Sequence, residues 1–305
     1  MTRIFTTLLI WLALAVPAFA QFPPFAQGTG LPNVYVGPGD IQPTGWLAWY
    51  GFRAFNAAYA TGSNPAINVT RASDSTSEDI MILASGDIDV SELNTFCSLG
   101  VTDTCTIGIW YDQSGNGNNW TSSGSSEPEL VFSCAGLGST MPCLSGAGGG
   151  GDFPVEMVST NNITQAQPYT FVGVGQRNGT YTGGQVIAGP FQVRFKTFMG
   201  WAPAPDTAAI GDPSVIVTVG NIRDNAWAAM VGIFLGDTVG ATLWANDGVT
   251  APALLGGSDD MAGYPLILFG ALGGSVLMTE FGVNGGDLTS VEPDIMANMR
   301  TYWRF

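Results

Sequence analysis

The sequence predicts an all-β fold in which two antiparallel sheets pack face to face, with a few short helices at the edge. Glycine is abundant, at 42 of 305 residues, while charged residues make up only 11% of the chain. Valine, isoleucine, threonine and aromatic residues recur in short apolar runs, and clusters of turn-forming residues separate these runs at regular intervals. These observations are typical of a β-sandwich rather than of a helical bundle.

The first twenty residues have the pattern of a secretory signal peptide. Arg3 supplies a positive charge, Ile4 to Val16 form an apolar segment, and Ala18-Phe19-Ala20 is a small-residue cleavage site. A membrane anchor is the alternative, but the apolar segment is shorter than the ~20 residues that a span needs. We therefore expect a protein that is secreted to the extracellular space or the periplasm. An extended lead-in over residues 21–43 would follow the cleavage site.

A single domain is expected over residues 44–305, and it would open with a helix from Trp46 to Tyr59 capped by Thr44. The large side chains of this helix fall near one face, where packing is favoured over a role as a ligand platform. They are Trp46, Trp49, Tyr50, Arg53 and Ala57.

A half-buried strand and a second helix come next. Ala66–Arg71 alternates apolar and polar residues, and Val90–Phe96 is preceded by a capping box made of Asp89 and Glu92. From Thr104 onward the chain is expected to form strands at 106–111, 129–133, 169–176, 185–187, 192–198, 215–220, 227–234, 238–245, 266–269 and 275–283.

A closing helix is predicted from Ser290 to Tyr302, with Ser290 as its cap and Pro293 in its first turn. The glycine run at 146–151 is interpreted as a loop inside the domain rather than a boundary.

Composition excludes several classes of function. The net charge is −15 with only nine lysines and arginines, whereas a nucleic-acid surface needs clusters of both. There is no histidine, which excludes Ser-His-Asp and Cys-His catalysis and any histidine-ligated metal. Carboxylates are therefore the remaining acid–base groups, and no metal or other cofactor is expected.

Four cysteines in an exported chain indicate two disulfides. Of the three pairings, we favour Cys97–Cys105 with Cys134–Cys143, because each closes a short local loop. Free thiols are the alternative.

The most specific local pattern is the run Trp110-Tyr111-Asp112-Gln113-Ser114-Gly115-Asn116-Gly117-Asn118-Asn119. It predicts a buried strand that ends in a tight turn. Asp112, Ser114 and Asn116 can hydrogen-bond to the backbone of that turn, and Gly117 permits a positive φ.

A calcium loop is the alternative for this turn, because its three polar side chains stand at positions 1, 3 and 5, as in an EF-hand. Position 12 is Ser123 rather than an acid, so the charge is too low. A self-bonded structural turn is favoured.

Several ordered motifs together resemble the catalytic domain of the arabinofuranosidase B family (glycoside hydrolase family 54), within the concanavalin A-like sandwiches. The resemblance covers roughly residues 45–122, and a weaker likeness to lectin-like sandwiches lies at 278–283. The matching segments are Tyr50-Gly51-Phe52-Arg53-Ala54 with Ala58-Tyr59, the strand Ala66–Asp74, and Cys97 to Cys105 leading into 109–118.

The resemblance implies a concanavalin A-like sandwich and a retaining glycosidase, which needs two carboxyl groups about 5–5.5 Å apart. The chain departs from the family at the positions that carry them. The counterpart of the nucleophile strand, 192–198, has no acid and contains Arg194 and Lys196. Ser275 follows the Gly-Gly pair where the family has its acid/base aspartate, and the family's adjacent cysteine pair is missing.

Three other acids remain candidates for catalysis: Glu156, Asp237 and Glu280. Glu280 lies in an apolar strand, so it is either exposed or buried and paired, and a structural role is favoured. Trp201 and Trp244 are the candidate sugar-binding aromatics, whereas Trp227 is expected in the core.

We therefore expect an exported sandwich that binds an extracellular polysaccharide or glycan without cleaving it. It would bind no nucleic acid and would have no membrane span once the signal is removed. The first alternative is a retaining α-L-arabinofuranosidase that uses displaced carboxylates. The second is a structural, adhesion or self-assembling surface protein, which low charge and many glycines would suit.

Overall fold

The computed structural model describes residues 34–97, 104–122, 127–137, 141–146, 157–178, 185–190, 196–201, 204–211, 216–220, 226–236, 239–250, 261–268 and 275–305. The chain divides into two units, Met1–Val34 and Tyr35–Phe305, and the second holds the β-sandwich. The expected signal peptide, residues 1–20, lies outside the described residues. Within the expected lead-in, Pro38–Ile41 forms a one-turn helix, α1.

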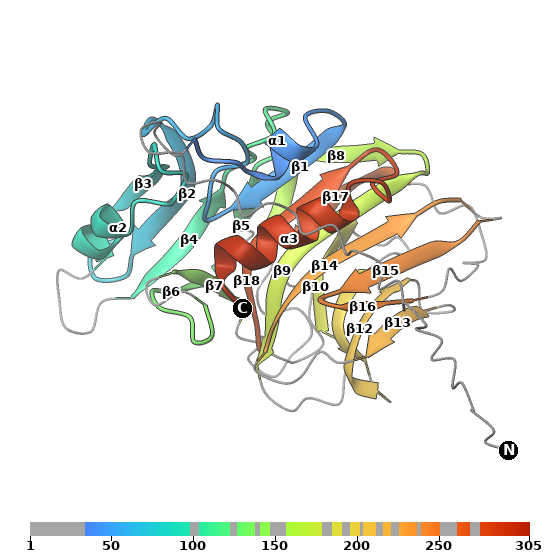
Figure 1. Ribbon diagram of the computed structural model, residues 1–305. Helices are drawn as coiled ribbons and strands as arrows, with labels where there is room; N and C mark the ends of the chain where they lie inside the picture. The colour runs from blue at the N-terminus through green and yellow to red at the C-terminus, as the bar shows by residue number, and fades with distance from the viewer. Residues whose placement is uncertain are drawn as a thin grey trace, which may run out of the picture. The chain divides into compact units, whose positions relative to one another are not determined.

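The first sheet of the sandwich is antiparallel and has β9 and β14 at its centre (Figure 1). Its strands, in spatial order, are β1 (Trp46–Gly51), β18 (Ser275–Asn284), β9 (Tyr169–Asn178), β14 (Trp227–Phe234), β15 (Ala241–Ala245) and β16 (Gly248–Val249).

The second sheet is also antiparallel and is longer. Its strands, in spatial order, are β3 (Ser77–Ile82), β2 (Asn64–Arg71), β4 (Cys105–Trp110), β5 (Trp120–Ser122), β8 (Met157–Gln165), β17 (Met261–Leu268), β10 (Gln185–Pro190), β11 (Lys196–Trp201), β12 (Ala204–Gly211) and β13 (Ile216–Gly220).

The two sheets face each other, because β11 contacts β9, β10 contacts β18, and β12 and β13 contact β15 without hydrogen-bonded pairing. Two short strands, β6 (Glu129–Val131) and β7 (Cys143–Gly146), join the sheets at one side, since β7 pairs with β18 and β6 pairs with β4. The predicted antiparallel sandwich is confirmed.

Aromatic side chains from both sheets fill the space between them. Tyr50 of β1 stacks on Trp120 of β5 with ring centroids 3.9 Å apart, and Trp120 stacks on Phe281 of β18 at 5.4 Å. Such pairs contribute about 0.5–1.5 kcal/mol each beyond the area they bury. The layers are therefore held together by rings that belong to distant parts of the sequence.

The predicted helix at Trp46–Tyr59 is wrong. Residues Trp46–Gly51 form β1, which pairs with β18 so that Tyr50 lies opposite Phe281. Both faces of β1 are covered by other parts of the protein, so its sequence lacks the alternation of apolar and polar residues that normally identifies a strand. Gly282 of β18 leaves the space that the Trp49 indole occupies, because a Cβ there would stand 2.2 Å from that ring. Packing on the neighbouring strand therefore decides the conformation.

The two other predicted helices are confirmed, with one cap corrected. Helix α2 (Val90–Cys97) begins where Glu92 donates its backbone N–H to Asp89 Oδ1 at 2.9 Å. Helix α3 (Glu292–Trp303) has Pro293 in its first turn. Its N-cap is Val291, without a side-chain cap bond, so the predicted capping role of Ser290 is wrong.

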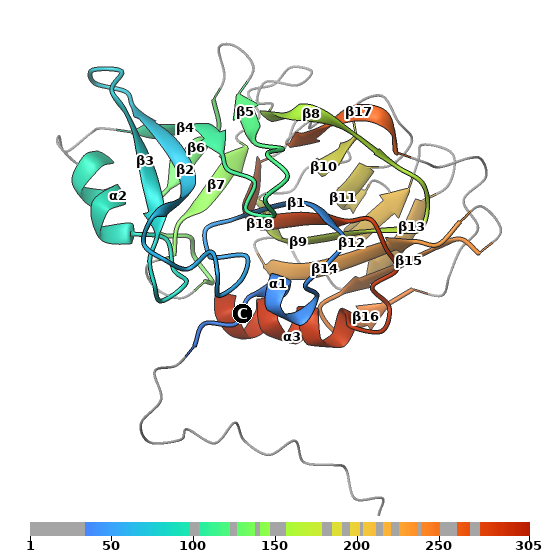
Figure 2. The ribbon, with the colours of Figure 1, turned by 90° about the horizontal axis from the view of Figure 1, so that it is seen from above.

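Predicted strands match β2, β4, β6, β9, β10, β11, β13, β14, β15, β17 and β18, with shifted ends in all but β14. Part of the predicted strand 192–198 lies outside the described residues. The prediction missed β3, β5, β7, β8, β12 and β16, which are short or polar. Figure 2 shows α3 and α1 together on the side of the first sheet that faces away from β8 and β17. No helix in the described ranges is long and apolar enough to cross a membrane.

Candidate functional site

The turn after β4 is closed by its own side chains. Asp112 Oδ1 accepts the backbone N–H of Ser114 at 2.9 Å, and its Oδ2 accepts that of Asn118 at 3.0 Å. Gly115 and Gly117 have φ values of +91° and +71°, a region that glycine enters without strain. The prediction of a self-bonded turn is confirmed.

The same turn is attached to β1. Trp49 donates its N–H to Asp112 Oδ1 at 2.9 Å, and Asn116 Nδ2 donates to the carbonyl of Trp46 at 2.8 Å. Gln113, which the sequence did not single out, donates to the Gly51 carbonyl at 2.8 Å. These bonds all reach backbone groups, so the turn positions β1.

Glu280 lies in β18 and is fully buried. Its Oε2 accepts Nε of Arg53 at 2.6 Å, and its Oε1 accepts Nη2 at 3.0 Å, so the pair is bidentate. Arg53 also donates Nη1 to Oδ1 of Asn298 at 2.7 Å. Burial is the largest single influence and lowers the pKa of Arg53, but the charge and hydrogen bond of Glu280, together with Tyr35 and Tyr302, outweigh it and raise that pKa above its usual value.

Two tyrosines enclose this ion pair. The guanidinium of Arg53 lies 4.7 Å from the ring centroid of Tyr302, and Tyr302 donates its hydroxyl to Asp87 Oδ1. Tyr35 donates its hydroxyl to the Ala54 carbonyl. Burial raises the pKa of both tyrosines, so both stay neutral. Of the two readings open for Glu280, the buried and paired one describes the structure.

The Arg53–Glu280 pair fastens α3 to the sandwich. Asn298 of α3 accepts from Arg53 and donates its Nδ2 to the Val36 carbonyl at 3.0 Å, while Arg53 follows β1 directly. Helix, sheet and the segment before α1 thus meet at one buried charge pair. Both oxygens of Glu280 are engaged there, which leaves neither for nucleophilic attack or proton transfer.

Glu156 and Asp237 lie outside the described residues, but their chain neighbours are described. Met157 begins β8 and Gln165 ends it, about 26 Å away at ~3.3 Å per residue. Tyr169 follows that far end and pairs with Phe234, which shortly precedes Asp237. Of these described neighbours, Met157 thus lies at one end of β8, and Phe234 of β14 pairs with a residue that follows the other end.

Lys196 and Ser275 open β11 and β18, respectively. Their side chains lie outside the described part of the structure, as does the side chain of Trp201, which ends β11. Trp244 lies in β15, half-buried and packed against the core. Trp227 is in the core as predicted and donates its Nε1 to the Ala135 carbonyl at 2.8 Å.

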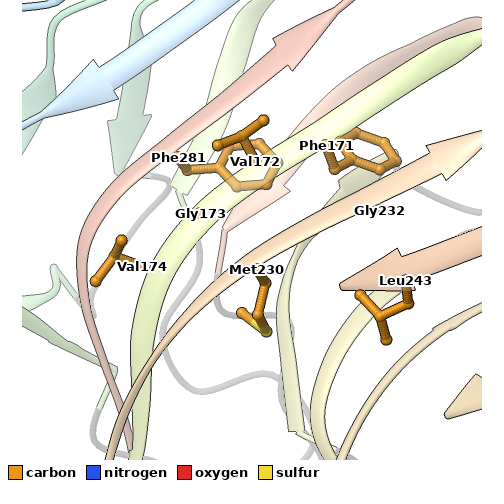
Figure 3. Close-up of a pocket in the computed structure, with 8 residues that line it drawn as sticks. All are labelled: Phe171, Val172, Gly173, Val174, Met230, Gly232, Leu243 and Phe281. Carbon is orange, nitrogen blue, oxygen red and sulfur yellow. The ribbon is translucent and has the colours of Figure 1, made fainter. Parts of the chain in front are cut away.

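Two cavities lined by described residues can be compared as ligand sites. The first, between the sheets, has a volume of only about 10 Å³ and an apolar lining, so it is a packing gap with no room for a ligand (Figure 3). Its lining residues are Phe171, Val172, Gly173, Val174, Met230, Gly232, Leu243 and Phe281.

The second cavity opens at the surface and has a volume of about 340 Å³. It contains an ion pair in which Arg300 Nη1 lies 2.5 Å from Asp247 Oδ1. Sequence patterns missed it because its residues come from four separate segments of the chain. They are Gly136, Ala226, Trp227, Asn246, Asp247, Arg300 and Phe305. Among the residues with described side chains, no group of three or more cysteines and acids converges as a metal site.

Comparison with known proteins supports the resemblance seen in the sequence. Residues 45–133 match the family model described as alpha-L-arabinofuranosidase B, catalytic. Alpha-L-arabinofuranosidase B of Emericella nidulans is 39% identical over 90 residues, which are 29% of this chain and 17% of that protein. The Aspergillus kawachii protein of the same name is 38% identical over 91 residues, 29% of this chain and 18% of its own length.

Solved structures extend the likeness to the whole sandwich. An arabinofuranosidase complexed with arabinofuranosyl-alpha-1,2-xylobiose aligns with a TM-score of 0.66 at 17% identity, over 88% of this chain and 65% of that one. A GH54 α-L-arabinofuranosidase soaked with a cyclic sulfate inhibitor aligns with a TM-score of 0.64 at 18% identity, over 88% and 66%. At this identity the structures support the fold alone.

The chain matches less than a fifth of the length of these sequence relatives and about two thirds of the solved structures. The family model, the relatives and the solved structures together confirm the resemblance to the arabinofuranosidase B catalytic domain. The similarity of sequence is concentrated in the first half of the sandwich. That part contains the turn at Asp112 and the partner of Glu280, Arg53.

Proposed function

We propose that this protein is a glycoside hydrolase that acts on α-L-arabinofuranosides of extracellular carbohydrate. The observation that carries the proposal is the match of residues 45–133 to the arabinofuranosidase B catalytic-domain model. This segment supplies Arg53, which pairs with β18, the Cys97–Cys105 disulfide, which joins α2 to β4, and the Asp112 turn, which is bonded to β1.

The proposed reaction needs a carboxylate nucleophile and a carboxylic acid/base on either side of the glycosidic bond. Glu280 is committed to Arg53, so we assign both groups to acids outside the described residues. Glu156 and Asp237 are candidates.

Binding without cleavage is the second candidate function, and a specific observation favours it. Lys196 and Ser275 stand in the segments that correspond to the family's nucleophile and acid/base. A cation and a hydroxyl cannot replace an ionised nucleophile and a proton donor. In this alternative the sandwich keeps its sugar-binding surface and lacks the chemistry.

We also propose that the chain is exported. Residues 1–20 have the signal-peptide pattern, and both disulfides expected for an oxidising compartment are formed, Cys97–Cys105 and Cys134–Cys143. Expression with and without residues 1–20 in a secreting host tests this. Export that depends on residues 1–20 is expected, and retention of the full chain inside the cell would refute the proposal.

Release of 4-nitrophenol from 4-nitrophenyl α-L-arabinofuranoside by the purified chain tests the main proposal. Turnover is expected, and Glu156→Gln or Asp237→Asn should reduce it by about 10³-fold if that acid takes part. Asp294→Asn, on the exposed face of α3, serves as the control and should keep full activity. Binding of arabino-oligosaccharides with no turnover would select the second candidate.

A further inference from the structure

We propose that the surface cavity beside Asp247 and Arg300, here called the α3-end pocket, binds one ring of a neutral oligosaccharide. The proposal goes beyond the proposed function, because this binding requires no bond cleavage. The pocket has a volume of about 340 Å³, at the lower end of the ~300–1,000 Å³ typical of small-ligand sites. It is therefore large enough for a small ligand, in contrast to the gap between the sheets.

The ion pair in the pocket has unused hydrogen-bonding capacity. The side chains of Asp247 and Arg300 are 83% and 38% exposed, and a single contact of 2.5 Å joins Nη1 to Oδ1. A carboxylate can accept about four hydrogen bonds, and a guanidinium can donate five. Adjacent hydroxyls of a sugar ring can donate to Asp247 and accept from Arg300 at the same time.

An apolar wall lies next to this pair. Phe305 is half-buried, and Trp227 borders the pocket with its indole edge. Gly136 has φ +88°, and a Cβ at this position would lie 3.1 Å from Cδ1 of Trp227. The absence of a side chain on Gly136 lets the backbone pack close against that edge, and Trp227 remains one of the residues that line the pocket. Polar groups beside aromatic carbon suit the C–H and O–H groups of a sugar.

The pocket is held in shape without a ligand. Asn246 has φ +50°, a conformation that asparagine tolerates better than most residues. Its Oδ1 accepts the N–H of Ala229 at 3.0 Å, which fixes the turn that presents Asp247. The Cys134–Cys143 disulfide closes the loop that carries Gly136. A site that is already ordered loses less entropy when it binds.

Charge favours a neutral ligand over an anionic one. The chain has a net charge of −15, which repels anions at long range. Within the pocket, Asp247 already neutralises the positive charge of Arg300. A uronate would have to displace this carboxylate, whereas a neutral ring can bind to both partners.

Isothermal titration of the full chain with xylotriose, cellotriose and arabinotriose tests the proposal, and trigalacturonate supplies the anionic comparison. We expect at least one neutral trisaccharide to bind. Asp247→Ala and Arg300→Ala should each weaken that binding about tenfold or more. Arg304→Ala is the matched control, because it removes the same charge from the exposed end of α3 without lining the pocket.

Two results would overturn the proposal: no neutral trisaccharide binds at millimolar concentration, or one binds with equal affinity to both pocket variants. Binding of trigalacturonate alone would also overturn it. Thermal melting of each variant checks that the fold is intact. Turnover of the aryl arabinofuranoside is measured separately, so its loss and the loss of pocket binding are distinguishable.

Discussion

Two ion pairs border α3, and they differ in their surroundings rather than in their chemistry. Arg53 and Glu280 are fully buried and bidentate, with Asn298 of the helix as a third partner. Arg300, two residues further along the helix, pairs with the exposed Asp247 through one contact. The buried pair has its hydrogen bonds satisfied within the protein and fastens the helix. The exposed pair keeps bonding capacity for a ligand.

This difference between the buried and the exposed ion pair indicates which part of the chain can bind a ligand. The segment that matches known enzymes contains Arg53 and the Asp112 turn, and both use their polar atoms on the protein's own backbone and side chains. All the residues that line the α3-end pocket lie outside that segment, and Gly136 comes just after it. Similarity of sequence therefore marks the scaffold, while accessible polar groups lie elsewhere.

The largest expected effect comes from breaking the buried pair. Glu280→Gln should lower the free energy of unfolding by about 3–5 kcal/mol, because it leaves the charge of Arg53 buried without a counterion. Asp247→Asn, the matched change in the exposed pair, should cost less than about 1 kcal/mol. Urea denaturation measures both.

Equal losses of unfolding free energy in the two variants would contradict this expectation, since burial would then not determine how much an ion pair contributes to stability. The double variant Arg53→Met with Glu280→Leu tests whether the unpaired buried charge is the cause of the loss. Replacing both charges by apolar side chains should restore most of the stability that Glu280→Gln removes.

The second largest effect is expected at the Asp112 turn. Asp112→Ala removes the acceptor of three backbone N–H groups, those of Trp49, Ser114 and Asn118, and should cost about 3 kcal/mol. Asp112→Asn keeps one oxygen and should lose about half as much. Denaturation midpoints test this order, and an Asp112→Ala variant as stable as wild type would contradict the structural role of the turn.

Local patterns predicted the parts of the fold that depend on local chemistry. The two disulfides, the Asp112 turn and α2 with its Asp89 cap each involve residues close together in the sequence, and each is present. Strand β1 was taken for a helix because its conformation depends on Gly282, more than 200 residues away. Pairing with a distant strand overrides the local secondary-structure propensity of the segment.

The candidate site was harder to predict for the same reason. The sequence left Glu280 either exposed or paired, and only the fold brings it to Arg53. The α3-end pocket joins Gly136, Asn246 and Arg300, which no spacing rule connects.

A smaller effect is expected from pH at the start of α3. Burial raises the pKa of Glu292 above its usual value, so the folded state favours the neutral carboxyl. Glu292 therefore contributes stability below about pH 4.3 that is lost as the pH rises through the raised pKa. Glu292→Gln cannot ionise, and it should melt at a higher temperature than wild type at pH 7 but not at pH 3.

Asp294→Asn, in the same turn but exposed, is the control for this change. It removes a negative charge near the helix N-terminus and should lower the melting temperature slightly at pH 7. If Glu292→Gln also lowered it at pH 7, the carboxylate of Glu292 would be stabilising, and burial would not be its dominant influence.

The smallest effect is expected from calcium. In the Asp112 turn both carboxylate oxygens accept backbone N–H groups, and Ser123 stands where an EF-hand supplies its bidentate acid. We propose that the turn needs no ion, so EDTA and millimolar Ca²⁺ should give the same melting temperature. A saturable rise with Ca²⁺, lost in Asp112→Asn, would mean that the carboxylate exchanges its backbone partners for the ion. The Asp112 turn would then belong with the exposed Asp247 as a ligand site rather than with the buried Glu280.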